Sequence, residues 1–407
     1  MRSTRIILLW LMGALSVLLI WPIQPAQAQL PEYNVLQYGA SNDGITPTEA
    51  AINRLSEEIG EAPATLVFPG GTYLVCGILR YRSNQTWKFL DHATIKLGNG
   101  CVSRLIDTSL GMTLVGILQP AARGQSNVTF LRLAIDGNKS NNPTINSGNG
   151  LDLYDVSDVL VSSPRIQNVP RDGLVIGGGS SIPANITIHR PVLRNNGLPG
   201  VNGGSGLAIV RGRGIVVTGI WAAGNMLFDI DLEPNPQDPP DAVRDVHING
   251  GLLGSLSAEG PRAFIGLAIS SSKGVQISGV VISKVVSVGN GRGFSVQGAE
   301  NIQFQNCLAY RNGQEGFYIS DASGVVLKRN RAIENSQGWF NYYSGFRING
   351  SDNLIESNQA NDNQDIPTQR YGFEEGAGAD GNTFVNNVAK GNASGSYLLV
   401  SPYSVWQ

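Results

Sequence analysis

Two short stretches set the pattern of this chain: Gly293-Phe294-Ser295-Val296 and, 23 residues further on, Gly316-Phe317-Tyr318-Ile319. Each consists of a glycine, an apolar residue, a variable residue and an aliphatic residue. The phrase recurs at intervals of 23 to 37 residues. Its copies begin at Gly150, Gly173, Gly206, Gly266, Gly293, Gly316 and Gly345, with an aspartate replacing glycine at Asp229 and a degraded copy at Gly372.

Each copy is too short to fold alone. Further short apolar runs follow the phrase, and an asparagine such as Asn312 or Asn335 closes the copy. Such units bury their apolar side chains only by stacking on one another. Asparagine tolerates a tight left-handed bend, and stacked asparagines can hydrogen-bond along a ladder. The repeat therefore predicts an all-β solenoid of parallel strands with about 9–11 coils. A β-sandwich, the alternative, needs hairpin turns every ~8–12 residues and predicts no such repeat.

The composition excludes several other classes of protein. Of 407 residues 51 are glycine, 42% are hydrophobic and only 15% are charged. A disordered chain would be more charged, and collagen would place glycine at every third position. The formal net charge of −2 argues against a nucleic-acid partner, which requires a concentrated basic face.

Residues 1–28 have the features of a secretion signal. Arg2 and Arg5 precede a charge-free apolar run, and Ala26-Gln27-Ala28 is a small-x-small cleavage site. We predict that cleavage removes this segment, which leaves no membrane span and places the protein outside the cell, in the periplasm or in the cell envelope. An uncleaved anchor is the alternative, although the run is short for a membrane span. Residues 29–407 are expected to form a single β-helix domain.

Residues from about 31 to 75 are expected to form an N-terminal cap. Thr46-Pro47-Thr48-Glu49 offers an N-cap threonine, a proline at the first helical position and a glutamate at the third. Ile52, Leu55 and Ile59 then supply an apolar helical face. Such a helix can plug the open end of a solenoid, where strand edges are unpaired.

Three cysteines occur, at positions 76, 101 and 307. Export permits a disulfide between Cys76 and Cys101. We favour the alternative that all three are free core residues, because a buried cysteine behaves as a small hydrophobe.

The N-terminal segment resembles a known family. Tyr33-Asn34-Val35-Leu36-Gln37-Tyr38-Gly39 and Val67-Phe68-Pro69-Gly70-Gly71-Thr72-Tyr73 are similar to the start of pectate-lyase-superfamily proteins of the rhamnogalacturonase and epimerase-like type. Leu133-Ala134-Ile135-Asp136-Gly137-Asn138 resembles a coil phrase of the same proteins. The resemblance implies a right-handed parallel β-helix, a fold that hosts hydrolases, lyases, epimerases and non-enzymes. The motifs of polygalacturonases and the Asp-Pro-His stretch of alginate epimerases are absent from the sequence.

One coil concentrates carboxylates. In the repeat frame Asp229, Asp231 and Glu233 are predicted to lie on one outward face, followed by a long Pro-rich insertion. Alternate residues on a strand lie ~6.5–7 Å apart, which suits two carboxylates that hydrolyse a glycosidic bond. We predict Asp231 as the first catalytic residue, with Asp229 or Glu233 as the second. A solvated acidic face and a Ca²⁺ site formed by these three carboxylates are the alternatives.

Other polar and aromatic residues are candidates for substrate binding. Asp152 and Tyr154 occupy outward positions three coils from Asp231, and arginines next to the acidic coil can hold a sugar carboxylate. Aromatic residues in an insertion before Gly345 can stack on sugar rings. The full set of predicted binding residues is Asp152, Tyr154, Arg211, Arg213, Trp339, Tyr342, Tyr343 and Arg347.

These features together predict an exported protein that acts on a polysaccharide in a groove along the β-helix. Hydrolysis by the carboxylate cluster is the preferred reaction, and no cofactor is required unless Ca²⁺ binds the cluster. The first alternative is a uronan lyase or epimerase, in which Arg211, Arg213, Arg347 or Ca²⁺ neutralises the sugar carboxylate. The second is a non-catalytic glycan-binding envelope or adhesion protein. The oligomeric state stays open.

Overall fold

The structure is a computed structural model that describes residues 30–105, 107, 115–143, 147–200, 203–256, 263–272 and 274–407. Within it, Pro31–Gln407 form one compact unit. The predicted signal peptide, residues 1–28, lies outside the described residues, so its cleavage stays a prediction. Within the described ranges no helix has the length and apolar character needed to cross a membrane.

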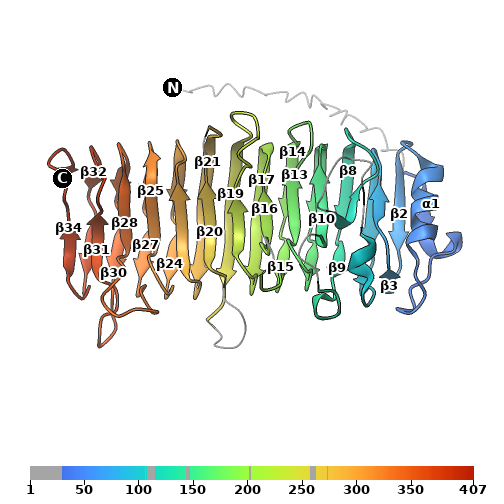
Figure 1. Cartoon of the computed structure of the whole chain (residues 1–407), viewed down its shortest axis with the longest axis horizontal. Helices are drawn as coiled ribbons and strands as arrows, with labels where there is room; N and C mark the ends of the chain where they lie inside the picture. The colour runs from blue at the N-terminus through green and yellow to red at the C-terminus, as the bar shows by residue number, and fades with distance from the viewer. Residues whose placement is uncertain are drawn as a thin grey trace, which may run out of the picture. The chain divides into compact units, whose positions relative to one another are not determined.

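Parallel strands stack from one end of this unit to the other (Figure 1). One sheet has 12 strands in the described residues, and they follow one another in chain order. They are β4 (Leu79–Tyr81), β7 (Gly116–Pro120), β10 (Asn149–Tyr154), β13 (Leu174–Gly177), β16 (Leu207–Ile209), β18 (Phe228–Leu232), β20 (Ile265–Ser270), β22 (Arg292–Gln297), β25 (Phe317–Ser323), β28 (Phe346–Ser351), β31 (Tyr371–Glu375) and β34 (Gly395–Leu398).

The remaining 23 strands form the second sheet, which supplies the other sides of the coils. They are β1 (Glu32–Asn34), β2 (Ala64–Phe68), β3 (Gly71–Val75), β5 (Gln85–Phe89), β6 (Ala93–Leu97), β8 (Ser126–Leu131), β9 (Ala134–Asp136), β11 (Ser157–Ser162), β12 (Arg165–Gln167), β14 (Ala184–His189), β15 (Val192–Arg194), β17 (Gly212–Ala223), β19 (Val243–Gly254), β21 (Ile277–Val288), β23 (Ile302–Gln305), β24 (Leu308–Tyr310), β26 (Val326–Lys328), β27 (Arg331–Ile333), β29 (Leu354–Glu356), β30 (Gln359–Asn361), β32 (Thr383–Val385), β33 (Val388–Lys390) and β35 (Val405–Trp406).

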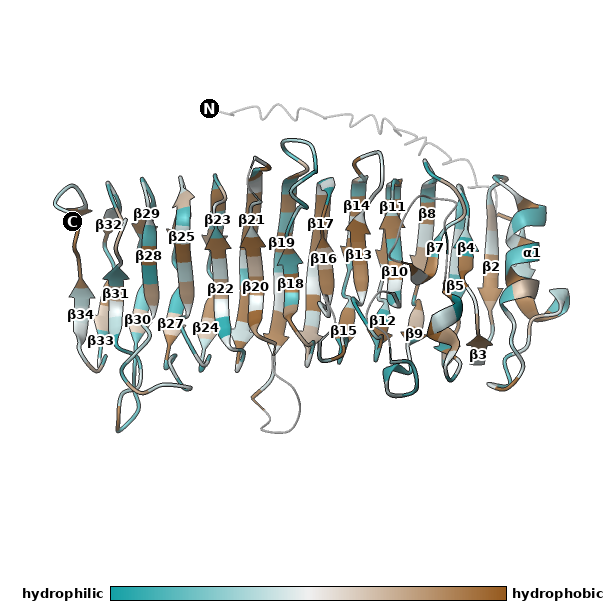
Figure 2. Ribbon diagram, viewed as in Figure 1, coloured by the Kyte–Doolittle hydropathy of each residue, from teal (hydrophilic) through white to brown (hydrophobic). Residues whose placement is uncertain are grey.

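The apolar residue after each repeat glycine stays in register from coil to coil. Phe294 pairs with Phe317, and Phe317 pairs with Phe346. Their rings stack at centroid distances of 4.8 and 4.7 Å, the spacing of neighbouring strands. All three side chains are fully buried, and apolar residues line the strands along the whole stack (Figure 2). The predicted solenoid with inward-pointing phrase residues is confirmed.

The 12-stranded sheet has one strand more than the predicted upper limit of about 11 coils. Leu79 of β4 pairs with Leu118 of β7, and Leu118 pairs with Leu151, the first apolar residue of a phrase. In β4 and β7 no glycine precedes that apolar residue, because Ile78 and Ile117 stand there. The repeat therefore did not reveal these two coils.

Asparagines form a buried ladder at one corner of the coils. The side-chain amide of Asn312 donates to Oδ1 of Asn335 at 3.0 Å, and that of Asn335 donates to Oε1 of Gln369 at 3.2 Å. The repeat glycines stand beside this ladder, where space is short. A Cβ on Gly316 would lie 3.0 Å from the amide nitrogen of Asn335 and 2.8 Å from a backbone oxygen. A residue larger than glycine would therefore crowd the asparagine ladder at this corner.

Helix α1 (Glu49–Ile59) lies at the N-terminal end of the stack (Figure 1), and it buries Ile52 and Leu55 in the core. The predicted capping box does not form. The helix begins two residues later than expected, with Thr48 at the N-cap, and the Thr48 side chain makes no capping bond. Its hydroxyl instead accepts from the backbone N–H of Ser41. The short 3-10 helices are η1 (Val35–Tyr38), η2 (Cys101–Arg104) and η3 (Lys139–Asn141).

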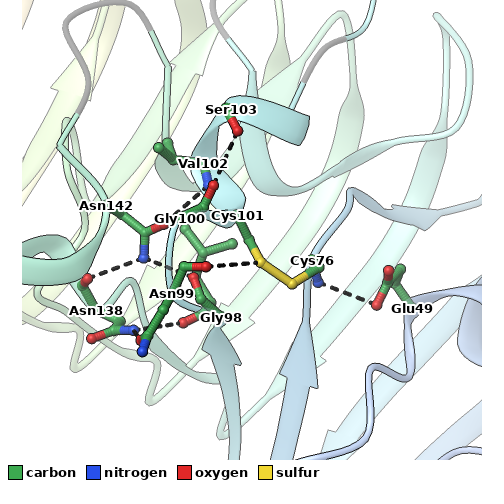
Figure 3. The surroundings of a disulfide bond; sticks show 11 residues. Glu49, Cys76, Gly98, Asn99, Gly100, Cys101, Val102, Ser103, Asn138 and Asn142 are labelled. Carbon is green, nitrogen blue, oxygen red and sulfur yellow. Dashed lines mark hydrogen bonds between the residues drawn. A yellow bond between two sulfur atoms is a disulfide. The ribbon is translucent and has the colours of Figure 1, made fainter.

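Cys76 and Cys101 form a disulfide (Figure 3), so the expectation of three free cysteines is wrong. The bond joins the end of β3 to η2, and Oε2 of Glu49 accepts from the backbone N–H of Cys76. Cys307 is buried and free, as expected. Sequence spacing alone does not show that the coil brings residues 76 and 101 together.

Candidate functional site

Asp231 lies on β18, on the outer face of the 12-stranded sheet. It pairs in register with Ala208 of β16 and Ala268 of β20, as the repeat predicts. These small neighbours leave open space above the strand. Asp231 and Glu233 line a cavity of about 260 Å³ there, together with residues of the Pro-rich insertion.

A third carboxylate lines the same cavity. Asp172 precedes β13, and its Oδ1 accepts 2.8 Å hydrogen bonds from the backbone N–H groups of Gly204 and Ser205. Arg171 also lines the cavity, and its Nε lies 3.6 Å from Oδ2 of Asp172. The cavity therefore combines three carboxylates with one guanidinium.

Sequence reasoning missed Arg171 and Asp172. They come directly before Gly173, whereas the prediction considered only outward positions after each repeat glycine. The residue just before a repeat glycine lies at the corner of the coil, next to the start of the sheet strand. From that position Arg171 and Asp172 reach the cavity that Asp231 and Glu233 line. Two adjacent charged residues directly before a repeat glycine, in a chain with only 15% charged residues, are the signal that could have revealed Arg171 and Asp172.

The Asp231 carboxyl is the most perturbed group in the cavity. Burial raises its pKa well above the ordinary value, and the neighbouring carboxylates of Glu233 and Asp172 raise it further. Its Oδ1 is buried and has no hydrogen-bond partner. Partial burial also raises the pKa of Glu233. A carboxyl group whose pKa is raised in this way, in a cavity shared with two other carboxyl groups, has the character of a proton donor.

Asp229 does not line this cavity, which corrects the prediction that it lies on one outward face with Asp231 and Glu233. Its side chain is fully buried, and its Oδ1 accepts from the amide of Asn225 at 2.8 Å. Asn225 also donates to the backbone oxygen of Leu193. The Asp229 carboxyl thus lies in the corner that holds the asparagine ladder, because the position of the repeat glycine faces that corner.

Asp152 and Tyr154 are also buried, so neither is positioned to contact a glycan directly as predicted. Asp152 has no exposed surface, and its Oδ1 accepts from the amide of Asn149 at 2.9 Å. Burial raises the pKa of Asp152 to about 7. Tyr154 packs with Val175 and Ala208 in a small apolar cluster. These residues support the outer face of the sheet rather than forming its open surface.

The two predicted arginines have separate positions. Arg211 forms an ion pair with Asp238 of the Pro-rich insertion, with Nε 2.8 Å from Oδ1. Both side chains are largely buried, so Arg211 holds the insertion in place. Arg213 lies on β17 of the 23-stranded sheet, in register with Arg244. It does not line the cavity around Asp231.

Arg347 lies on the same sheet face as Asp231, four strands further along the stack. Its guanidinium lies 3.9 Å from both Glu315 and Glu374, and Arg292 contacts Glu315 at 2.9 Å. Burial raises the pKa of the Tyr343 phenol, and the neighbouring Glu315 carboxylate raises it further. The structure thus brings Tyr343 and Arg347 together as part of one charged cluster.

Trp339 and Tyr342 extend from the insertion before β28. They are 64% and 59% exposed, and their ring centroids are 6.4 Å apart. Tyr342 in turn contacts the Tyr343 ring at 4.8 Å. The insertion therefore presents two open aromatic faces above a buried base of charged residues.

The three carboxylates proposed as a Ca²⁺ site do not converge. Asp229 bonds within the asparagine ladder, whereas Asp231 and Glu233 line the cavity. No group of three or more His, Cys, Asp or Glu side chains is arranged to hold a metal ion within the described part of the chain.

Comparison with known families identifies the fold. A family model described as "Right handed beta helix region" matches residues 260–404. The chain folds as a right-handed parallel β-helix. A second family model, "Rhamnogalacturonase A/epimerase, pectate lyase-like", matches residues 33–87, the segment in which the resemblance was recognised. No curated protein matches the sequence.

Solved structures share this β-helix with different functions. The A-module of mannuronan C-5 epimerase AlgE4 from Azotobacter vinelandii is 18% identical with a TM-score of 0.73, and the match covers 92% of this chain and 100% of that one. The family 28 exopolygalacturonase of Yersinia enterocolitica is 13% identical with a TM-score of 0.61, covering 92% and 78%. Gene product 12 of bacteriophage phi29 is 15% identical with a TM-score of 0.63, covering 92% and 56%. At these identities the likeness concerns the fold.

Proposed function

We propose that this β-helix is a polysaccharide-acting enzyme, and that the cavity around Asp231 hydrolyses a glycosidic bond. The observation that carries the proposal is the Asp231 carboxyl, whose pKa is raised by burial and by Glu233 and Asp172, which line the same cavity. Two of the similar solved structures are polysaccharide-acting enzymes by name, which supports the substrate class. Export of the protein is part of this proposal and depends on residues 1–28.

Asp231 acts as the general acid in the proposed reaction. It donates its proton to the glycosidic oxygen as the bond to the anomeric carbon breaks, so the leaving sugar departs as an alcohol. Glu233, which is exposed, takes a proton from the attacking water. Alternate residues on a strand are ~6.5–7 Å apart, a separation that leaves room for that water and favours inversion.

Asp172 and Arg171 position the substrate in this proposal. Asp172 is anchored by two backbone N–H groups, so its carboxylate presents a fixed negative charge to the cavity. Such a charge stabilises the positive charge that develops on the sugar ring during bond cleavage. Trp339, Tyr342 and Arg347 lie further along the same face, where they form a second binding area for the polymer.

Arg171 supports elimination as the second candidate reaction. A guanidinium in the cavity can bind a uronate carboxylate and acidify the adjacent carbon–hydrogen bond, as a lyase or an epimerase requires. The two reactions give different products. Hydrolysis produces reducing ends without new ultraviolet absorption, whereas elimination produces an unsaturated sugar that absorbs.

A panel of neutral and acidic polysaccharides tests the proposal. We expect at least one to lose chain length, with reducing ends appearing and ultraviolet absorbance unchanged. An absorbing product would replace hydrolysis with elimination. Binding without any chemical change across the panel would favour a glycan-binding envelope or adhesion protein instead.

A further inference from the structure

We propose that the 23-stranded sheet carries a second binding surface, for a strand of anionic polysaccharide with carboxylate groups. The surface is a line of arginines on three successive coils, which we call the arginine stripe. It lies away from the 12-stranded sheet that carries Asp231. It consists of Arg132, Arg165, Arg190 and Arg194.

Strand register places the stripe along the axis of the stack. Leu131 of β8 pairs with Ser162 of β11, and Ser162 pairs with His189 of β14. Arg132 and Arg190 follow the first and last of these residues, so they occupy the same corner two coils apart. Arg165 and Arg194 lie on β12 and β15, just beyond that corner.

The stripe holds positive charge that the protein leaves largely unpaired. All four arginines are exposed. Arg132 pairs with Asp91, but Arg165, Arg190 and Arg194 take part in no ion pair within the described part of the chain. Asp136 aligns in strand register with Gln167 on the next coil, and Gln167 aligns with Arg194 on the coil after that. This is a net cationic surface on a protein whose overall charge is −2.

A hollow accompanies these charges. A pocket of about 390 Å³ lies at the Arg132 corner, and its polar lining consists of Arg132, Arg165, His92, Thr94, Ser163 and Asp91, the ion-pair partner of Arg132. Two guanidinium groups and two hydroxyls therefore line one recess, in which Asp91 pairs with Arg132 and leaves the Arg165 guanidinium without an ion pair. Guanidinium groups bind carboxylates through paired hydrogen bonds, and the hydroxyls match sugar hydroxyl groups.

The spacing of the stripe favours a polymer over a single ion. Neighbouring coils are ~4.8 Å apart, close to the length of one pyranose unit in an extended chain. Trp221 and Leu252 continue the line on the next two coils, and both are 40% exposed. The Arg194 guanidinium lies 4.7 Å from the centre of the Trp221 ring. A sugar chain that runs along the stack axis toward the C-terminal coils would contact the stripe arginines first and the Trp221 ring next.

Two matched double variants test the stripe. Arg165→Gln with Arg190→Gln removes two stripe charges. Arg329→Gln with Arg331→Gln removes two exposed arginines from a distant part of the same sheet, so both variants change the net charge equally. All four side chains are exposed, which predicts unchanged melting temperatures.

Affinity electrophoresis through gels containing polygalacturonate measures binding, with neutral dextran and single-stranded DNA as comparison ligands. We expect the stripe variant to lose about tenfold in polygalacturonate affinity and the control variant to match the unmodified protein. Dextran should retain neither. If the stripe variant fails to fold, the single substitutions Arg165→Gln and Arg190→Gln should each show a smaller loss.

Three results would overturn the proposal. The first is equal polygalacturonate retention of the stripe variant and the unmodified protein. The second is an equal loss in the control variant, which reports net charge alone. The third is retention by DNA as strong as that by polygalacturonate. Because the stripe does not contact the Asp231 cavity, turnover of a short oligosaccharide by the stripe variant separates this proposal from the enzymatic one.

Discussion

The side-chain amide of Asn225 donates to Oδ1 of Asp229 at 2.8 Å, in a corner where the other full copies of the repeat have glycine. Gly254 pairs with Val288, so the residue that corresponds in sequence to Asn225 and Asn290 in this coil is Leu256, which is 57% exposed. Leucine has no amide, so the ladder is interrupted there. The carboxyl of Asp229, which also interacts with Asn290, compensates for the missing rung. The replacement of glycine by aspartate therefore supplies a hydrogen-bond acceptor for the Asn225 amide.

Stability should depend on the protonation of Asp229. Burial raises its pKa to about 8, against the opposing effect of the hydrogen bond from the Asn225 amide. The folded protein therefore binds this proton more tightly than the unfolded chain, in which an aspartate has a pKa of ~3.9. The resulting stability is complete at low pH and is lost as pH rises through about 8. Urea unfolding between pH 5 and 9 measures this slope.

Asp229→Asn should remove that contribution, because an amide stays neutral at every pH. We expect the free-energy difference between this variant and the unmodified protein to shift in favour of the variant as pH rises. Asp229→Ala leaves the Asn225 amide without this acceptor and should destabilise at every pH by about 1–3 kcal/mol. A pH-independent difference between Asp229→Asn and the unmodified protein would show that Asp229 is ionised in the fold.

The pH dependence of turnover should report Asp231. Burial raises its pKa, and a general acid must be protonated, so kcat should fall as pH rises through that pKa. In Asp231→Asn this alkaline limb should disappear along with most of the activity. An alkaline limb that persists unchanged in the residual activity of the variant would assign the acid to another group.

The exposed aromatic faces should affect substrate binding more than the chemical step. Trp339→Ala and Tyr342→Ala each remove a stacking surface worth ~1 kcal/mol, so KM for a long polysaccharide should rise severalfold with kcat nearly unchanged. A short oligosaccharide that fills only the Asp231 cavity should show no change. Val388→Ala, which alters an exposed apolar residue elsewhere, is the matched control. Unaltered KM in both aromatic variants would remove this loop from the binding surface.

The disulfide should stabilise the N-terminal coils. It joins residues 25 apart in sequence, and closing a loop of that size in the unfolded chain is worth ~3 kcal/mol. Cys76→Ser with Cys101→Ser should lower the melting temperature, whereas Cys307→Ser leaves the disulfide intact. Equal melting of the oxidised protein and the double variant would contradict a stabilising role.

The fold could be predicted because the same short sequence pattern recurs in most coils. The Gly-apolar-x-aliphatic repeat and the stacked asparagines gave the parallel coils, and Asp231 was placed in its register with Ala208 and Ala268. The site was predicted only in part. Alternation along a strand put Asp229 beside Asp231, but the corner turns its side chain into the ladder. Burial of Asp152 and the ion pair of Arg211 with Asp238 depend on contacts between distant segments, which a repeat pattern does not encode.

A comparison of two isosteric variants on the same strand tests the central claim most directly. Asp231→Asn and Asp229→Asn each replace a carboxyl group of raised pKa with an amide that does not titrate, but only Asp231 lines the cavity. The measurement is the rate of chain-length loss with a polysaccharide that the unmodified protein degrades. We predict that Asp231→Asn slows it by about 10²–10⁴-fold and that Asp229→Asn leaves it nearly unchanged. Unchanged turnover by Asp231→Asn would contradict the account.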